Sequence, residues 1–205
     1  MSTVTAANVY EPLLQFWFGE PADAPSVAQR QAALWWGKSS VIDNEIRERF
    51  SGLRDLAIQG ELDAWEETSR GRLALILLID QFSRNMFRDR LEAFTYDYLA
   101  QEWCLAGIDA GADTELLPIE RVFFYLPMEH SESRVDQLRS VALFEALAAL
   151  ALPAQQALFD GYLDFAKRHQ VIIERFDRFP HRNHILGRVS TATEIEFLKQ
   201  PGSAF

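Results

Sequence analysis

The stretch Leu73–Ile79 reads LALILLI and contains no polar residue, which restricts what can surround it. A helix that is apolar on every side has to be covered by other elements on every side. The stretch is far shorter than the roughly 20 apolar residues that a membrane-spanning helix needs. We therefore expect residues 70–82 to form a central helix in the core of a folded domain.

The rest of the chain repeats its apolar residues at helical spacing and rarely alternates with the period of a strand. Pairs of such segments, joined by short turns, predict an all-α fold. We expect antiparallel helical hairpins stacked in a tetratricopeptide-like arrangement, although the sequence shows no regular repeat. No linker or low-complexity stretch divides the chain, so residues 1–205 are predicted to form a single all-helical domain.

Charge and cysteine content argue against several kinds of partner. The chain carries 30 acidic and 20 basic residues, a formal net charge of −10, which opposes binding to nucleic acid or to an anionic bilayer. The N-terminal MSTVTAANVYEPLL lacks the basic and apolar regions of a secretory signal. The single cysteine, Cys104, has no partner for an internal disulfide. We expect a cytoplasmic protein with no nucleic-acid and no membrane partner.

Polar side chains gather where the apolar stretch ends. Asp80 is the first charged residue after it, at the edge of the core, where an unpaired carboxylate would cost several kcal/mol. Arg84 follows four residues later and lies on the same face of a continuing helix, with Gln81 and Asn85 as a second polar pair beside it. These residues predict either a structural ion pair that closes a buried helix or part of a functional site.

All four histidines lie in the second half of the chain. His130, in PMEHSE, follows Pro127, which we expect to end one helix, and precedes the start of the next, where a ring is well placed to meet an anion. Glu132 lies two residues further on. His169 falls on the inward stripe of its helix, where an imidazole needs a carboxylate or a carbonyl as its partner.

An unusual group of hydrogen-bond donors occupies residues 176–188, which read FDRFPHRNHILGR in an otherwise acidic chain. Pro180 fits the first turn of a short helix, whose positive end would lie among the donors. Such a group either satisfies buried carboxylates such as Asp80 or awaits an anionic ligand. The donors in question are Arg178, His181, Arg182 and Asn183.

Other chemistries find little support in the sequence. It has no G-x-S-x-G elbow, no Gly-rich phosphate loop and no Cys-x-x-Cys pair. His181 and His184, three residues apart, come closest to a metal-binding spacing, and we predict neither a metal nor a cofactor. Thr191 and Glu194 form a Thr-x-x-Glu capping box, which predicts a helix start rather than a catalytic glutamate.

Five motifs, in order along the chain, resemble a bacterial family of unknown function, the DUF924 family. They are QFWFG (15–19), LILLIDQFSRNMFR (75–88), FFYLPMEHSE (123–132), RHQVIIERFDRFPHRNHILGR (168–188) and STATEIEFL (190–198). The resemblance implies an all-helical, tetratricopeptide-like fold and implies no established activity. Two positions differ from the family pattern: Ser83 stands where proline is expected, and Asp177 stands where glycine is expected before a turn.

We interpret these motifs as a polar pocket that binds a small anionic metabolite. The residues leave open whether a reaction is catalysed. Two alternatives also remain open: a scaffold that holds a peptide partner, and a buried polar network with a purely structural role. The predicted ligand-binding residues are Asp80, Arg84, Asn85, Glu132, Arg178, Arg182 and Asn183, and the candidate acids or bases are His130, His169 and His181.

Overall fold

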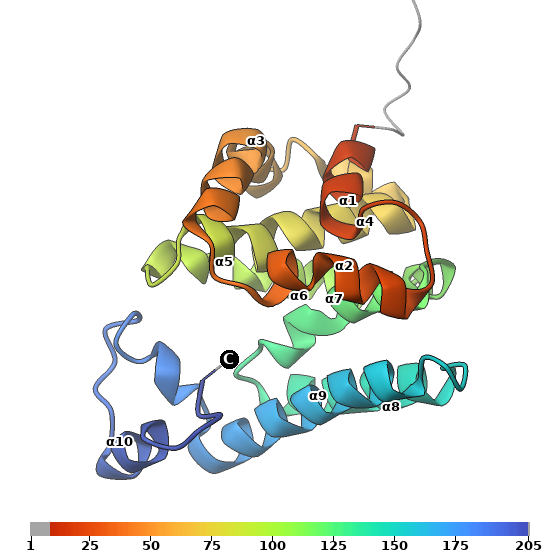
Figure 1. The fold of residues 1–205 in the computed structure, drawn as a ribbon. Helices are drawn as coiled ribbons and strands as arrows, with labels where there is room; N and C mark the ends of the chain where they lie inside the picture. The colour runs from red at the N-terminus through yellow and green to blue at the C-terminus, as the bar shows by residue number, and fades with distance from the viewer. Residues whose placement is uncertain (1–8, 205) are drawn as a thin grey trace, which may run out of the picture.

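The computed structural model describes residues 9–204, and this part of the chain is helical, with no β-strand (Figure 1). The all-α class predicted from the sequence is confirmed, whereas the tetratricopeptide-like stacking and the single domain over 1–205 stay predictions. Residues 1–8 and 205 of that domain lie outside the described residues. The α-helices are α1 (Glu11–Phe18), α2 (Ala24–Trp36), α3 (Ser40–Ile58), α4 (Ser69–Ile76), α5 (Ser83–Met86), α6 (Asp97–Asp109), α7 (Pro118–Glu129), α8 (Arg134–Ala149), α9 (Gln156–Phe176) and α10 (Ala192–Leu198).

Shorter helical segments join several of these helices. A π-helical segment, η3 (Leu77–Phe82), leads from α4 directly into α5. The 3-10 segments are η2 (Asp63–Glu67), η4 (Leu91–Ala93), η5 (Ala112–Glu115) and η6 (Pro180–Arg182).

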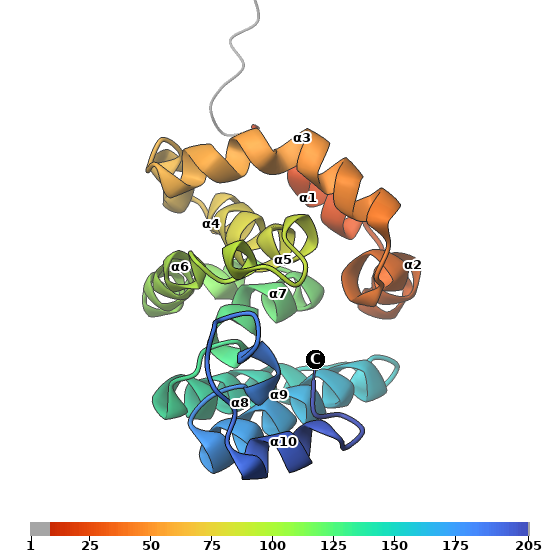
Figure 2. The same cartoon turned by 90° about the vertical axis from the view of Figure 1, so that its left-hand side faces the viewer.

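The helices form an upper body and a lower layer, which α7 connects (Figures 1 and 2). Helices α1 to α6 make up the body, and α8 and α9 pack side by side as an antiparallel hairpin below it. The segment 177–191 leaves the end of α9 and rises toward the body in both views before the chain turns back into α10. This course brings residues near the C-terminus against residues from the middle of the chain.

The centre of the body is the apolar stretch that the sequence pointed to. Each residue of Leu73–Ile79 is at most 1% exposed. Trp17 of α1 is fully buried and contacts Phe82 and Phe123, with ring centroids 5.3 and 5.5 Å apart. Burying a large apolar side chain contributes roughly 1.5–3 kcal/mol, so these rings tie α1, η3 and α7 together strongly.

Ser83 fills the position where the family pattern has proline. Its hydroxyl accepts a hydrogen bond from Arg54 Nε at 2.8 Å and donates to the Leu78 carbonyl at 3.3 Å. Both contacts are buried, and the second satisfies a carbonyl of the π-helical segment. The serine therefore provides two hydrogen bonds at the junction of η3 and α5.

Pro127 does not end its helix, contrary to the expectation. Helix α7 continues to Glu129, and His130 follows as its C-terminal cap rather than at the start of α8. Proline removes one backbone hydrogen bond in a helix interior. In α7 the neighbouring Phe124, Leu126 and Met128 are all buried, so packing on several sides holds the helix together through the proline.

Asp177 adopts the left-handed backbone conformation, with φ 57° and ψ 11°. Aspartate is one of the few residue types other than glycine that are found in this region. Its carboxylate also pairs with Arg134 at 2.6 Å, which joins the end of α9 to the start of α8. The turn that glycine would make is thus made by aspartate.

The capping box before α10 is present as predicted. Glu194 N donates to Thr191 Oγ1 at 3.3 Å, and Thr191 N donates to Glu194 Oε2 at 2.7 Å. Replacing Thr191 by alanine is expected to destabilise the protein by about 1 kcal/mol, because one helix-terminal N–H loses its acceptor. Urea unfolding measures the change. The nearby, exposed Val189→Ala serves as the control, and an equal loss in both variants would contradict the capping role.

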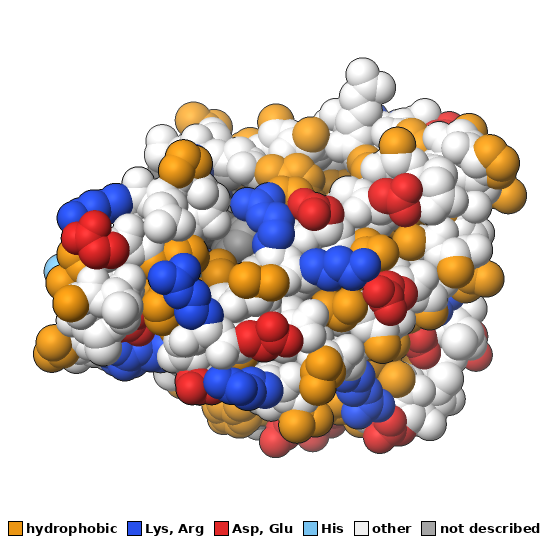
Figure 3. All heavy atoms as spheres, turned by 90° about the horizontal axis from the view of Figure 1, so that it is seen from below, with side chains coloured by type: hydrophobic (Ala, Val, Ile, Leu, Met, Phe, Trp, Pro, Cys, Tyr) orange, Lys and Arg blue, Asp and Glu red, His pale blue; other side chains and the backbone are white. Residues whose placement is uncertain are grey.

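Within residues 9–204, none of the helices combines the length and apolar character needed to cross a membrane. The lower face carries basic and acidic side chains interspersed with apolar ones (Figure 3). On α8 to α10, Lys167 pairs with Glu145 at 3.2 Å and Lys199 with Glu196 at 2.6 Å. These two lysines are therefore each balanced by a neighbouring carboxylate.

Candidate functional site

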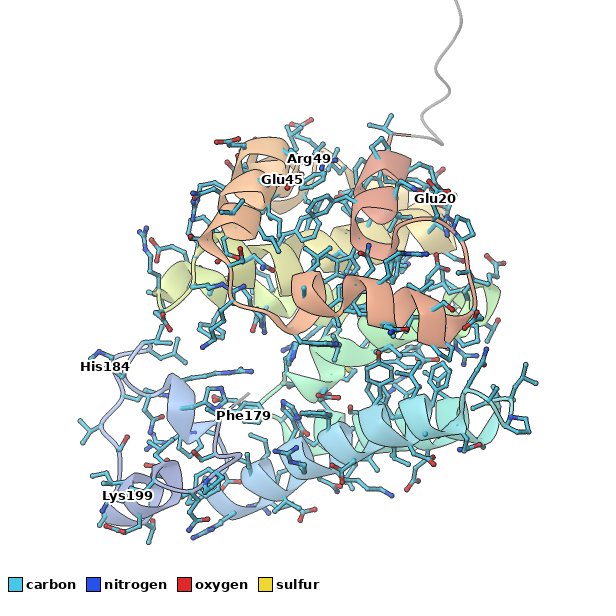
Figure 4. The ribbon with its side chains drawn as sticks, viewed as in Figure 1. Glu20, Glu45, Arg49, Phe179, His184 and Lys199 are labelled. Carbon is cyan, nitrogen blue, oxygen red and sulfur yellow. The ribbon has the colours of Figure 1, made fainter. Side chains whose placement is uncertain are left out.

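A hollow of about 380 Å³ lies where segment 177–191 meets the upper body. Three parts of the chain form its walls: η4 with the first turn of α6, the turn between α7 and α8, and η6 with the residues after it. Figure 4 shows Phe179 on the inner side of segment 177–191 and His184 at its outer edge. The lining residues are Leu91, Phe94, Thr95, Asp97, Tyr98, Gln101, His130, Ser131, Glu132, Ser133, Arg182 and Leu186.

Arg182 is the unusual residue of this hollow. It is only 6% exposed, and its guanidinium lies over two rings, 4.4 Å from the Phe179 centroid and 5.1 Å from that of Phe94. Nη1 donates to the His130 carbonyl at 2.9 Å, but Nε is buried without an acceptor among the described residues. No described carboxylate forms an ion pair with it. Burial lowers the pKa of Arg182 to about 10, so the side chain is still charged at neutral pH.

The two carboxylates in the wall of the hollow each have their own arginine. Asp97 accepts two hydrogen bonds from Arg84, at 3.0 and 2.9 Å. Glu132 accepts two from Arg188, at 2.6 and 2.9 Å, and one from the Phe179 N–H at 2.8 Å. Bidentate pairs of this kind hold both partners in a fixed geometry. Neither carboxylate forms an ion pair with Arg182, although the charges of both favour the ionised form of its guanidinium.

Asp80 lies behind the hollow and is 1% exposed. As predicted, Arg84 is its ion-pair partner, with Nη2 3.4 Å from Oδ1. His130 Nδ1 lies 2.7 Å from the same oxygen, and Gln81 Nε2 donates to Oδ2 at 2.5 Å. Burial by itself raises the pKa of Asp80, but Arg84 and His130 outweigh it and hold that pKa well below its usual value. Asp80 is thus an ionised carboxylate in the core.

His130 connects Asp80 to the hollow. Burial lowers the pKa of His130 below its ordinary value, although the Asp80 charge acts in the opposite direction. The imidazole is therefore neutral at pH 7, and its Nδ1–H donates to the ionised Asp80. This tautomer leaves Nε2 as a proton acceptor on a ring that lines the hollow, with 16% of the side chain exposed.

Behind His130 lies a second buried pair. His169 Nδ1 is 3.1 Å from Glu129 Oε1 and 2.8 Å from the Phe165 carbonyl, and both side chains are 5% exposed. Although the two are within ion-pair distance, burial raises the pKa of Glu129 to about 8 and lowers that of His169 well below its ordinary value. We take the pair to be neutral at pH 7, since desolvation favours the uncharged form of each.

Glu129 gives a testable pH dependence. The pKa of the Glu129 carboxyl is near 4.5 in the unfolded chain and is raised to about 8 on folding. Its contribution to the stability of the fold is therefore fully present below pH 4.5 and is lost as the pH rises toward about 8. Relative to Glu129→Gln, the wild type is expected to lose about 1.4 kcal/mol per pH unit between pH 5 and pH 8. Urea unfolding of both proteins across this range measures the difference. A difference that does not change with pH would show that Glu129 is ionised in the folded protein.

Several predicted site residues lie outside the lining of the hollow. Arg178 donates to Glu194 at 2.7 and 2.8 Å, on the other side of segment 177–191. Asn85 donates to Asp43 at 3.0 Å. A neighbouring acceptor holds each of these two side chains, so the structure does not bring them together with Arg182 in the lining of the hollow.

Two further candidates are close to the hollow without lining it. Asn183 donates to the Ser190 hydroxyl at 3.0 Å. The His181 ring packs on Phe179, with centroids 5.7 Å apart, and burial lowers its pKa to about 4. His169 likewise supports His130 from behind, with ring centroids 6.1 Å apart. Of the predicted residues, His130, Glu132 and Arg182 line the hollow, and Asp80 and Arg84 contact its walls.

The sequence analysis missed the contribution of α6. Asp97 and Gln101 are polar residues four positions apart in a stretch rich in aromatic and small side chains. This spacing places the two side chains on one face of a helix, as it does for Asp80 and Arg84. It was the only local indication that α6 presents a polar face to the site. Arg188 was also missed, because its partner Glu132 lies 56 residues away in the sequence.

The described residues contain no group of three or more His, Cys, Asp or Glu side chains placed to hold a metal ion. What the fold and the geometry define is an all-helical protein with a hollow lined by a buried arginine that forms no ion pair with a described carboxylate. The family model described as "Bacterial protein of unknown function (DUF924)" matches residues 13–202, and the chain belongs to this family.

A solved structure of a protein of unknown function from Agrobacterium tumefaciens is similar over most of its length. It is 34% identical in sequence, with a TM-score of 0.79, and the match covers 95% of this chain and 99% of that one. No curated protein matches the chain. The comparisons thus establish the family and support the fold.

Proposed function

We propose that this protein binds a small anion in the hollow and that Arg182 is the residue that contacts it. One observation carries the proposal: the buried guanidinium of Arg182 has no carboxylate partner among the described residues. A buried charge without a counter-charge is costly, and proteins normally pair it. An anionic ligand would supply the missing partner through charge-assisted hydrogen bonds.

The surroundings of Arg182 support this role because they fix its position in advance. Phe94 and Phe179 hold the plane of the guanidinium, and the His130 carbonyl holds one of its nitrogens. The pairs Arg84–Asp97 and Arg188–Glu132 hold the adjacent walls. A site whose side chains are already oriented pays less for ordering them when the ligand binds.

His130 is proposed as the residue that exchanges a proton with the bound molecule. Its ring lines the same hollow, and Asp80 orients it through Nδ1 at 2.7 Å. A neutral imidazole held by a carboxylate in this way is a general-base arrangement. Catalysis by the protein would require His130, whereas binding of the anion would require only Arg182.

The proposal is tested by screening the full-length protein against small anions with ligand-observed NMR. The panel contains acetate, benzoate, sulfate and inorganic phosphate. At least one of them is expected to bind saturably at millimolar concentration or below, and binders are expected to compete with each other. Absence of saturable binding across the panel would contradict the proposed function.

We also propose a cytoplasmic location and no nucleic-acid partner, in line with the net charge of −10 and the free, buried Cys104.

The two alternatives predicted from the sequence, a peptide scaffold and a structural network, differ from the proposal in one respect. Neither of them requires Arg182 to take up an anion.

A further inference from the structure

Segment 177–191 is anchored to the rest of the protein apart from the main core. The apolar core of the described residues falls into two clusters, and the smaller one consists of Ile172 and Ile173 of α9 with Phe179. Phe179 is fully buried and is the only residue of the segment that belongs to either cluster. Regions with few buried apolar contacts open locally at a lower free energy than the core does. We therefore expect the segment to detach while Leu73–Ile79 stay folded.

Hydrogen bonds within the segment hold its shape. The Arg188 N–H donates to the Asn183 carbonyl at 2.8 Å, and Asn183 Nδ2 donates to the Ser190 hydroxyl at 3.0 Å. Arg178 Nη2 donates to the Val189 carbonyl at 3.0 Å and closes the loop at its base. Compact loops that are tied by their own side chains are stable units. The segment is therefore able to move as one unit.

A small set of hydrogen bonds fastens the segment to the turn between α7 and α8. Glu132 accepts one bond from the Phe179 N–H at 2.8 Å and two from Arg188 at 2.6 and 2.9 Å. Arg182 Nη1 donates to the His130 carbonyl at 2.9 Å. Because Arg182 also lines the hollow, movement of the segment would open the hollow on that side.

His181 fits the closed arrangement at neutral pH because its imidazole is uncharged there. Its ring packs on Phe179, with centroids 5.7 Å apart. Burial, followed by the charge of Arg182, lowers the pKa of His181 from 6.5 to about 4. In a detached segment the ring is hydrated, and its pKa returns toward 6.5. The contribution of His181 to the closed form is therefore fully present above pH 6.5 and is lost as the pH falls toward about 4.

Ionisable groups face His181 from η6, the turn between α7 and α8, α9 and the end of the segment. They are Arg182, His130, Glu132, His169 and Arg188. The pKa of Glu132 lies below its ordinary 4.5, so this carboxylate is ionised in both forms above pH 5. Burial also lowers the pKa of His130, which therefore acts in the same direction as His181. Hydration of the neutral Glu129–His169 pair moves its proton from the carboxyl to the imidazole and changes the number of bound protons little. His181, which leaves with the segment, is therefore the main sensor between pH 6.5 and pH 5.0.

We propose that segment 177–191 is a lid that moves away from the hollow on acidification, with protonation of His181 as its trigger. Proton uptake by one histidine, whose pKa rises from about 4 to 6.5 on opening, increases the opening equilibrium constant about tenfold or more between pH 6.5 and pH 5.0. The inference goes beyond the proposed function and does not depend on it, because the lid opens without any ligand.

Amide hydrogen exchange, followed by NMR on the full-length protein, tests the lid. The Phe179 N–H reports its opening, because the acceptor of this N–H is Glu132, outside the segment. Its protection factor, corrected for the intrinsic pH dependence of exchange, is expected to fall about tenfold or more between pH 6.5 and pH 5.0. It is also expected to be lower than those of Leu73–Ile79 at both pH values. Protection equal to that of Leu73–Ile79 would show that the segment opens only when the whole protein unfolds, and a pH-independent value would remove the trigger, so either result overturns the proposal.

A variant pair tests His181 as the trigger. His181→Phe keeps a ring against Phe179 and removes the titrating group, so the pH-dependent change in the Phe179 protection factor is expected to be about tenfold smaller. His184→Phe makes the same substitution at the exposed outer edge of the segment (Figure 4) and is expected to retain the wild-type change. Equal pH-dependent changes in the two variants would contradict the role of His181.

Glu132→Gln tests the fastening without altering any histidine. The variant loses the charge that strengthens the bonds from Phe179 and Arg188, so the Phe179 protection factor is expected to fall about tenfold at both pH values. A protection factor equal to that of the wild type would contradict the lid.

Discussion

Replacing Arg84 by methionine is expected to destabilise the folded protein by about 3–5 kcal/mol, the largest stability change among the variants considered. Arg84 is the cation that balances both Asp80 and Asp97. Removing one partner of a buried ion pair leaves an uncompensated charge, and this costs far more than the pair itself contributes. Urea or thermal unfolding at pH 7 measures the loss. Lys199→Met, which breaks an exposed pair with Glu196, is the matched control and is expected to cost less than about 1 kcal/mol.

The pH dependence of this loss identifies its cause. In the wild type the pKa of Asp80 is lowered on folding, so its contribution is present above its unfolded pKa near 4 and is lost as the pH falls through the folded value. In Arg84→Met, burial is expected to raise that pKa instead. The stability difference between the two proteins should therefore shrink as the pH falls from 7 to 3. A difference that is constant over this range would point to lost packing rather than to charge.

Replacing Arg182 by methionine is expected to have the opposite profile: anion binding falls by about 100-fold or more, while stability without ligand changes by less than about 1 kcal/mol. The binding loss follows from removing one partner of a buried, hydrogen-bonded charge pair, which typically costs 2–5 kcal/mol. Stability changes little because methionine keeps the contact with Phe94 and Phe179, and removing a buried charge that has no ion pair offsets the loss of the hydrogen bond to the His130 carbonyl. Calorimetric titration and urea unfolding measure the two effects.

The comparison of Arg84→Met and Arg182→Met separates the functional reading from the structural one. Both arginines are near the hollow, and the substitution is the same. If the buried polar residues around Asp80, Arg84 and Arg182 serve only to fix the packing of segment 177–191, then Arg182→Met should destabilise the protein about as much as Arg84→Met does. Arg49→Met, on the exposed side of α3 in the upper body (Figure 4), provides a binding control that should leave anion affinity unchanged.

Local chemistry made part of this architecture predictable. The LALILLI stretch is apolar on all sides and is at the centre of the body, and Asp80 pairs with Arg84 as their spacing indicates. The capping box at Thr191 is also formed. In each case the interacting residues are within a few positions of one another, so a helical period is sufficient to relate them.

The rest depended on contacts between distant segments. Arg178 and Arg182 are in the same RFPHRN motif, yet one reaches Glu194 and the other the hollow. Asp177, in the left-handed conformation, precedes both, and Arg182 ends a 3-10 turn, so their side-chain directions cannot be derived from the periodicity of an α-helix. The pairing of Glu132 with Arg188, across 56 positions, has no local signal at all.

Asn85 shows where helical spacing was not sufficient. Gln81 and Asn85 were expected to form one polar pair beside Asp80 and Arg84. Gln81 donates to Asp80 at 2.5 Å, whereas Asn85 donates to Asp43 of α3 at 3.0 Å. Asp43 is 42 positions away from Asn85, so the local spacing carried no signal for this contact.

The central claim is that Arg182 holds an anion, and NMR of its side-chain Nε–H group tests this claim most directly. The signal is assigned as the Nε–H resonance that disappears in Arg182→Met, and the anion of the screening panel that binds most tightly is then titrated into the wild-type protein. We predict a saturable shift of this resonance, larger than that of any other arginine, because the anion contacts the same guanidinium where Arg182 lines the hollow. An unchanged Arg182 resonance at saturating ligand, with shifts at other arginines instead, would contradict the account.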